Sequence, residues 1–268
     1  MRSIKAALSF GILALLAASQ GRATVIVTYA EKPGIETSSL VNTTVDTFNS
    51  NSVGYHTAVG DPVLTWAGVG TFDRLDIKSA DSYGGANNTN YAVVGVGVDT
   101  ETALTLNTPS SYFGLWWSAG DAQNVLDFYS GANGTGTLLA QFTTANLLKA
   151  LPKSYYGNPN TGYAAGQDAG EPFAFINFFG ASGTAWQSVV LRNSSGTGFE
   201  ADNFTSRVAA YNSSTDGAMP GIVLESINGT QETMVSPEPG PILAVGFLCC
   251  LSAGGSFMRR FHRRVAQI

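Results

Sequence analysis

Four acidic residues stand where a carboxylate can do chemistry, namely Asp121, Asp127, Glu200 and Asp202. Two carboxylates placed across a cleft are the catalytic groups of most glycoside hydrolases. Glu200 and Asp202 are two positions apart in an expected strand, so their side chains should share one face, about 7 Å apart. Because a hydrolase pair usually comes from different strands, this spacing does not favour hydrolysis.

The same two acids suit a hard cation better. Calcium binds carboxylate and amide oxygens, and Glu200, Asp202 and Asn203 offer both kinds. The simpler interpretation is that Asp202 and Asn203 end their strand through hydrogen bonds to the backbone. We favour the simpler interpretation. A structural calcium stays open as the alternative, and no other cofactor is expected.

Other catalytic and metal-binding motifs are missing from the sequence. His56 is the one histidine outside the C-terminal tail, and its Gly-, Asn- and Thr-rich surroundings predict an exposed polar residue in a loop. The only cysteines, Cys249 and Cys250, lie in a C-terminal apolar run. No G-x-S-x-G elbow, HExxH, CxxC or P-loop occurs. The sequence therefore predicts that the protein is not an enzyme.

Aromatic side chains are the other candidates for a binding role, because sugar rings stack on them. Trp116 and Trp117 are adjacent in an expected strand and point to opposite faces, so we expect at most one of them in the core. Three tyrosines of a Gly- and Asn-rich loop are better candidates for an exposed carbohydrate-binding surface: Tyr155, Tyr156 and Tyr163.

The scaffold that carries these residues is expected to be all-β. The sequence is rich in Gly, Thr, Ser and Asn, which favours short strands joined by turns. Strands are expected at 24–29, 45–48, 63–66, 69–72, 91–98, 102–106, 111–117, 125–129, 137–142, 173–179, 185–191 and 198–207, with one helix at 144–151. This order predicts an antiparallel β-sandwich, jelly-roll-like, over residues 24–208, followed by a polar linker at 209–236.

The N-terminal residues 1–23 have the features of a secretory signal peptide. Arg2 and Lys5 precede the apolar run 6–18, and small residues at Gly21 and Ala23 fit a cleavage site after Ala23. The expected mature domain contains no cysteine. Between Thr24 and Ser236 it holds 18 acidic and 7 basic residues, a net charge of −11, which disfavours nucleic acid as a partner.

The C-terminal tail has three parts in a fixed order. Pro237, Glu238 and Pro239 precede an apolar run at 241–258, which as a helix is about 27 Å long and just reaches across a bilayer core. A basic cluster follows, which by the positive-inside rule stays in the cytoplasm. It contains Arg259, Arg260, Arg263 and Arg264.

This tail, residues 237–264, resembles the PEP-CTERM sorting signal. The resemblance implies a Gram-negative bacterium that makes exopolysaccharide, a transient stay in the inner membrane, and exosortase as the partner that cuts near Pro-Glu-Pro. A plain membrane anchor with a proline-rich stalk is the alternative. The protein is then expected in the cell envelope, on the outer surface or in the extracellular matrix.

A second resemblance covers most of residues 45–208. The segments 112–117, 126–129, 175–179 and 199–203 are similar to exosortase-dependent surface proteins of the Npun_F0296 type. This family implies a fold and a location but no activity. We therefore expect a structural or adhesive role linked to exopolysaccharide. A carbohydrate-binding module is the alternative, and a secreted glycoside hydrolase is a more distant one.

Overall fold

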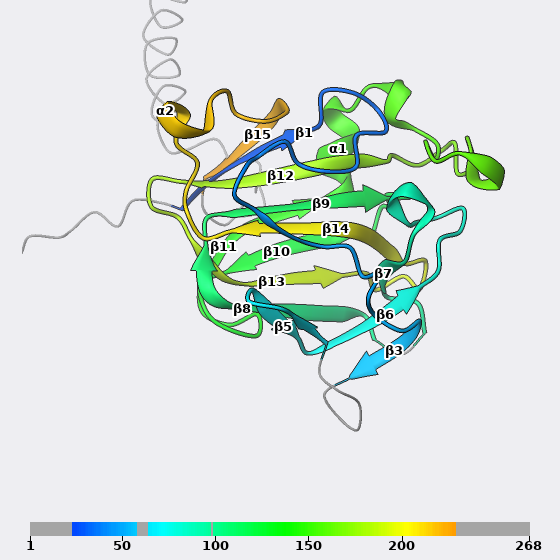
Figure 1. Ribbon diagram of the computed structural model, residues 1–268, viewed down its shortest axis with the longest axis horizontal. Helices are drawn as coiled ribbons and strands as arrows, with labels where there is room; N and C mark the ends of the chain where they lie inside the picture. Colours follow the sequence, from blue (N-terminus) through cyan, green and yellow to red (C-terminus); the bar gives the residue numbers. More distant parts are fainter. Residues whose placement is uncertain (1–22, 58–63, 98, 229–268) are drawn as a thin grey trace, which may run out of the picture. The chain divides into compact units, whose positions relative to one another are not determined.

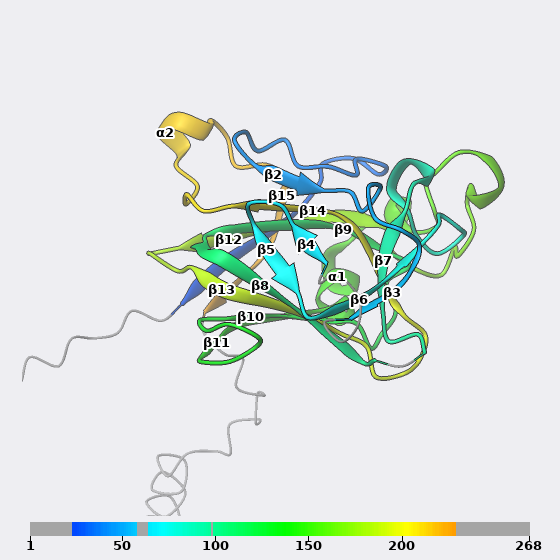
Figure 2. The same cartoon turned by 60° about the horizontal axis from the view of Figure 1, so that its bottom comes forward.

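Two antiparallel β-sheets pack face to face in the computed structural model, which describes residues 23–57, 64–97 and 99–228 (Figures 1 and 2). The expected all-β sandwich is thus confirmed. Residues 1–22 of the expected signal peptide and the whole sorting signal lie outside the described residues. None of the helices among the described residues has the length and hydrophobicity of a membrane span.

The larger sheet has nine strands, and β1 lies between the last strand and a strand from the middle of the chain. Its order is β15 (Ile222–Asn228), β1 (Thr24–Tyr29), β12 (Ala174–Ala181), β9 (Tyr112–Ser118), β14 (Phe199–Arg207), β7 (Tyr91–Val94), β6 (Arg74–Lys78) and β3 (Gly54–Thr57). A short strand, β2 (Thr44–Asp46), pairs with the second half of β14.

The smaller sheet has six strands, in the order β11 (Leu138–Thr143), β10 (Val125–Tyr129), β13 (Trp186–Arg192), β8 (Glu101–Ser110), β5 (Gly70–Phe72) and β4 (Thr65–Trp66). The expected helix is present as α1 (Thr144–Ala150) and follows β11 directly. A second short helix is α2 (Ser213–Asp216), and single 3-10 turns occur at Ala86–Asn88, Lys153–Tyr155 and Gly162–Ala164.

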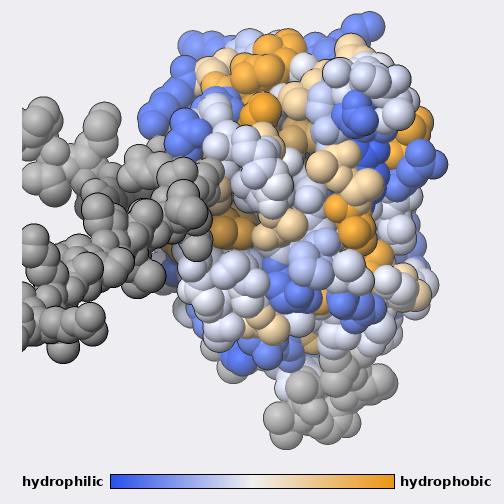
Figure 3. Space-filling view, turned by 90° about the vertical axis from the view of Figure 1, so that its left-hand side faces the viewer, coloured by the Kyte–Doolittle hydropathy of each residue, from blue (hydrophilic) through white to orange (hydrophobic). Residues whose placement is uncertain are grey.

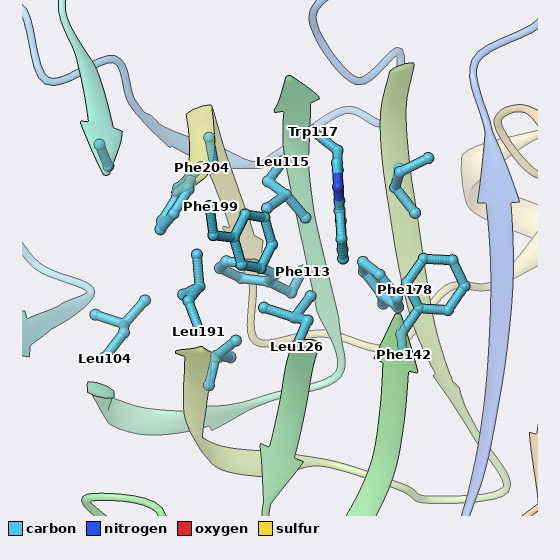
Figure 4. Close-up of a cluster of buried hydrophobic side chains, with 14 of the residues drawn as sticks. Leu104, Phe113, Leu115, Trp117, Leu126, Phe142, Phe178, Leu191, Phe199 and Phe204 are labelled. Atoms are coloured by element: carbon cyan, nitrogen blue, oxygen red, sulfur yellow. The ribbon is translucent and has the colours of Figure 1, made fainter. Parts of the chain in front are cut away.

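Aromatic side chains from both sheets fill the space between them (Figure 4). Alternate residues of β9 point inward, among them Phe113 and Trp117, and both are fully buried. The Trp117 ring lies 4.3 Å from that of Phe199, centroid to centroid, and Phe128 of the smaller sheet lies 4.9 Å from Phe178 of the larger. Such aromatic pairs add to the free energy gained by burial alone.

The outer face of the larger sheet is covered as well. Trp116 points away from Trp117, yet only 1% of it is exposed, because it packs in a second cluster with Phe173 and Phe175. The segment after β1 crosses this face, where Leu40 packs in a third cluster and Ser38 donates to Asn177. The expectation that at most one of the two tryptophans is buried was wrong, because loops form a third layer over the sheet.

The expected linker at 209–236 contains the edge strand of the larger sheet. β15 pairs with β1 over its whole length, from Thr24 opposite Asn228 to Tyr29 opposite Ile222. The connection from β14 is also fixed, because the Arg207 guanidinium donates two hydrogen bonds to the Asp216 carboxylate, at 2.9 and 2.8 Å. The boundary at residue 208 was therefore wrong, and the folded part continues to Asn228.

Two further strands, β3 and β6, were not expected. His56 is on β3, where it is half-buried and its Nε2 lies 2.8 Å from the backbone oxygen of Ser52, so the loop expected there was wrong. On the side of the molecule that Figure 3 shows, hydrophobic residues lie in small groups between hydrophilic ones, as is usual on a globular protein.

Candidate functional site

The outer face of β14 carries two buried carboxyl groups. Phe199 and Ala201 point into the core, so Glu200 and Asp202 face the opposite side, as the strand alternation predicts. Their exposed fractions are 5% and 0%. A bulge follows, because the pairing with β9 shifts between Asp202 and Thr205. The two acids share a face, but they have different neighbours.

Glu200 forms the floor of a cavity of about 250 Å³. Asp121, from the loop after β9, and Glu171, from the loop before β12, are half-buried at its sides. Tyr83 and Thr197 are exposed at its rim, and half of the Tyr83 side chain is accessible. The cavity is lined by Tyr83, Ala119, Asp121, Glu171, Thr197 and Glu200.

The Glu200 carboxyl is only partly satisfied. Its Oε2 is buried and has no hydrogen-bond partner within the described residues. Gly198 gives the other oxygen its space, because a Cβ at that position would lie 2.0 Å from Oε1. An unpaired buried oxygen of this kind costs free energy unless something binds it.

Burial raises the pKa of Glu200, and together with the negative charges of Asp121, Glu171 and Asp81 it brings that pKa to about 9. Burial likewise raises the pKa of Glu171, again with Asp121 and Asp168 adding to the effect. The charges that act on the cavity floor are therefore all negative. At neutral pH the Glu200 carboxyl keeps its proton.

Asp202 belongs to a separate environment. It accepts hydrogen bonds from the backbone N–H groups of Ala86, at 2.8 Å, and Asn203, at 2.6 Å. The Asn203 amide donates to the backbone oxygen of Glu36 at 2.8 Å. Burial raises the pKa of Asp202 to about 8 and that of Glu36 to about 7. Asp202 and Asn203 thus bind the backbone, as the simpler interpretation has it.

The structure does not bring Glu200, Asp202 and Asn203 together around one ion. Glu200 faces the cavity with Asp121 and Glu171, whereas the other two side chains contact backbone atoms. Across the part of the chain that the structure describes, no three acids, histidines or cysteines are placed to hold a metal ion. Asp127, on β10 of the smaller sheet, is paired with Arg192 and Gln141 and is also separate.

The tyrosines expected at a carbohydrate surface are placed differently. Tyr155 is 5% exposed, its hydroxyl donates to the backbone oxygen of Ala30 at 2.6 Å, and its ring meets Tyr29 edge to face. The prediction that Tyr155 is exposed was wrong, because its loop folds back onto β1. Tyr156 is half-buried, and the side chain of Tyr163 lies outside the description. Tyr83, which precedes Gly84 and Gly85, is the exposed aromatic residue beside the acids, and it was not among the expected binding residues.

A larger cavity of about 300 Å³ lies beside the end of β14, next to β2 and β5. Its lining is polar, with Ser110 and Ser206, and its charged residue is Arg207. Because Arg207 is already bound to Asp216, this cavity offers no free charge. The Glu200 cavity is therefore the better candidate site.

Comparisons with known proteins add little to this geometry. No protein-family model and no curated protein matches the chain. Among solved structures it is similar to the catalytic domain of a GH87 alpha-1,3-glucanase determined with tetrasaccharides, at 12% identity and a TM-score of 0.30. The match covers 71% of this chain and 30% of that one. A likeness at this level decides neither the fold nor the activity.

Chemically, the cavity can bind a polar or cationic group. A buried carboxyl that holds its proton can donate one hydrogen bond, and in its ionised form it accepts several. A buried acid with a raised pKa beside other carboxyl groups is also the combination that acid–base hydrolysis uses. The exposed Tyr83 ring adds an apolar surface on which a sugar ring can stack.

Proposed function

We propose that the chain is an exported envelope protein, sorted by exosortase, whose jelly-roll-like sandwich has a structural or adhesive role linked to exopolysaccharide. The observation that carries the proposal is the fit between the folded part and the two end signals. β1 begins at Thr24, directly after the expected cleavage site, and β15 ends at Asn228, nine residues before Pro237. The apolar run at 241–258 acts as a transient membrane helix.

The non-enzymatic role is supported by the residues of the sandwich. Its expected mature part has no thiol and one histidine, and the Nε2 of that histidine contacts a backbone oxygen. A carbohydrate-binding module is the second candidate, and the specific observation in its favour is the acidic cavity with Tyr83 at its rim. Both roles place the protein next to polysaccharide.

Processing tests the sorting proposal. We expect mass spectrometry of the mature protein, made in an exopolysaccharide-producing host with exosortase, to find Thr24 at its start and no residues beyond about Gly240. The variant Glu238→Ala, or a host without exosortase, should retain the tail. Recovery of an intact Arg263-Arg264 end from the mature pool would rule out cleavage near Pro-Glu-Pro and leave a plain anchor. Binding of the mature protein to purified exopolysaccharide separates adhesion from a purely structural role.

A further inference from the structure

The Glu200 cavity has several features of a binding site for one positively charged sugar unit. An acidic cluster alone does not make a site, but here the buried Glu200 side chain lines the cavity, and one of its carboxyl oxygens has no hydrogen-bond partner within the described residues. Glu200 is 5% exposed, so the cost of its unpaired Oε2 is not relieved by open solvent. A hydrogen-bond donor that enters the cavity and reaches this carboxyl group would relieve it.

The charge of the cavity selects the sign of the ligand. Asp121, Glu171 and Asp81 all act on Glu200 with negative charge. An acidic sugar, such as a uronic acid or a sulfated unit, would be repelled. A protonated amine is attracted by the same field and donates to carboxylate oxygens through strong, charge-assisted hydrogen bonds.

The spacing of the acids selects the size of the ligand. Asp121, Glu171 and Glu200 line one cavity, yet no three acids among the described residues stand close enough to hold one metal ion. The cavity volume, about 250 Å³, is just below the usual range for ligand pockets. A single sugar ring suits this space better than an ion or a long oligosaccharide.

The rim selects for a ring with an apolar face. Tyr83 is 50% exposed beside the opening, and its phenol offers a flat surface. The Thr197 hydroxyl, also exposed at the rim, can bond to a sugar hydroxyl. We propose that this cavity binds an amino sugar with a free ammonium group, through Glu200, Asp121 and Glu171, with its ring stacked on Tyr83. This inference rests on the proposed function, since it names the class of glycan that the protein contacts.

Three trisaccharides that differ only at carbon 2 test the proposal. The full chain, purified in mild detergent, is titrated with the β-1,4-linked trimers of glucosamine, glucose and N-acetylglucosamine, at a pH of about 6 where the amine is charged. We expect the glucosamine trimer to bind about tenfold more tightly than the other two, as one charge-assisted contact would give. Calorimetry in two buffers should show proton release, because the ammonium displaces the Glu200 proton.

Matched variants tie the preference to the cavity. Glu200→Gln should reduce the tenfold preference to less than about threefold, whereas Glu101→Gln, an exposed acid on β8 of the other sheet, should leave it unchanged. Tyr83→Ala should weaken all three trimers alike, and Tyr83→Phe should restore them. A preference that persists in Glu200→Gln, or equal binding of all three trimers, overturns the proposal.

Two other ligands decide between classes of site. A rise in melting temperature with Ca²⁺ that Glu200→Gln abolishes would make the cavity a metal site and overturn the sugar proposal. If tri-lysine binds as tightly as the glucosamine trimer, the cavity is a site for a basic peptide, and the sugar proposal is again overturned. Failure of all trimers, while the mature protein is still cut by exosortase and binds purified exopolysaccharide, refutes this inference and leaves the proposed function standing.

Discussion

Three buried acids lie on the outer side of the larger sheet, and their carboxyl groups differ in the hydrogen bonds that they accept. Asp202 is held by two backbone N–H groups, which reduce the cost of its charge. Glu36 accepts one such bond, from Asn87 at 2.7 Å. Glu200 has an oxygen without a partner within the described residues, and burial, with nearby acids adding to the effect, raises its pKa to about 9. Burial without compensation is the ground on which we propose Glu200 as a binding residue.

Stability should fall as the pH rises from about 5 to 9. Folding raises the pKa of Glu200 from 4.5 to about 9, so between these values the folded state holds a proton that the unfolded state has lost. The stabilisation is fully present below the pKa of the unfolded state and is lost as the pH rises to the pKa of the folded state. The loss is up to about 1.4 kcal/mol per pH unit for each such group. Glu36 and Asp202 act in the same direction. Urea unfolding at several pH values measures the slope.

The variant Glu200→Gln measures how much of this pH dependence comes from Glu200, because glutamine has no proton to lose. We expect a shallower slope of the free energy of unfolding against pH. Between pH 5 and pH 8 the variant should therefore lose less stability than the wild type. Glu101→Gln is the matched control, since Glu101 is exposed. Equal slopes for the wild type and Glu200→Gln would contradict the raised pKa.

Part of this site could be predicted from the sequence. The period of two in a strand placed Glu200 and Asp202 on one face, and a single strand carries that information. Asp121 and Glu171 reach the cavity from loops after β9 and before β12, so their meeting depends on how distant strands are ordered in the sheet. No local pattern contains that order. The burial of Tyr155 could not be foreseen for the same reason.

At the level of elements, most strands were predictable and the edges of the larger sheet were not. β1, β10 and α1 match their expected ranges within a residue, because dense apolar alternation or a helical run marks them. β15 shows one buried residue, Ile227, among exposed and half-buried ones. An edge strand needs few apolar residues, since its main contribution is the backbone pairing with one neighbour.

The docking of β15 can be tested at two positions of the same strand. Ile227 is 2% exposed and belongs to the main core, so Ile227→Ala should cost about 2 kcal/mol or more in the free energy of unfolding. Val223 is 62% exposed, and Val223→Ala should change the free energy of unfolding by less than about 0.5 kcal/mol. Chemical unfolding of a fragment of residues 24–229 gives both values.

Equal costs at the two positions would mean that β15 does not dock as described. A fragment that stops at residue 208 offers a second check. It lacks the whole strand and should be less stable than the fragment of residues 24–229, with the edge of β1 left open to association.

At the scale of the whole molecule, the two sheets depend on one core. The same hydrophobic cluster contains Val27 and Phe204 from the larger sheet and Leu104, Leu126 and Trp186 from the smaller one. Neither sheet can therefore lose its packing without exposing the inner face of the other. The folded part also contains no cysteine, so this packing, with its hydrogen bonds, provides the stability without disulfide bonds.

Unfolding of residues 24–229 should therefore occur in one transition. We expect the far-ultraviolet circular dichroism, which reports strands, and the fluorescence of the four buried tryptophans to change at the same urea concentration. Addition of a reductant should leave the midpoint unchanged. Two separate midpoints would show that the sheets unfold independently, and a shift with reductant would reveal a covalent link that the sequence does not provide.

The pairing of the first strand with the last sets the order in which this molecule can be completed. The Thr24 side chain donates to Asn228, 204 residues further along the chain. Closing a loop of that length costs about 5 kcal/mol in chain entropy before any contact repays it, and distant pairings of this kind slow folding. A chain that emerges N-terminus first must keep β1 unpaired on one side until its final strand is available. The last step of assembly is then the pairing of β15 with β1.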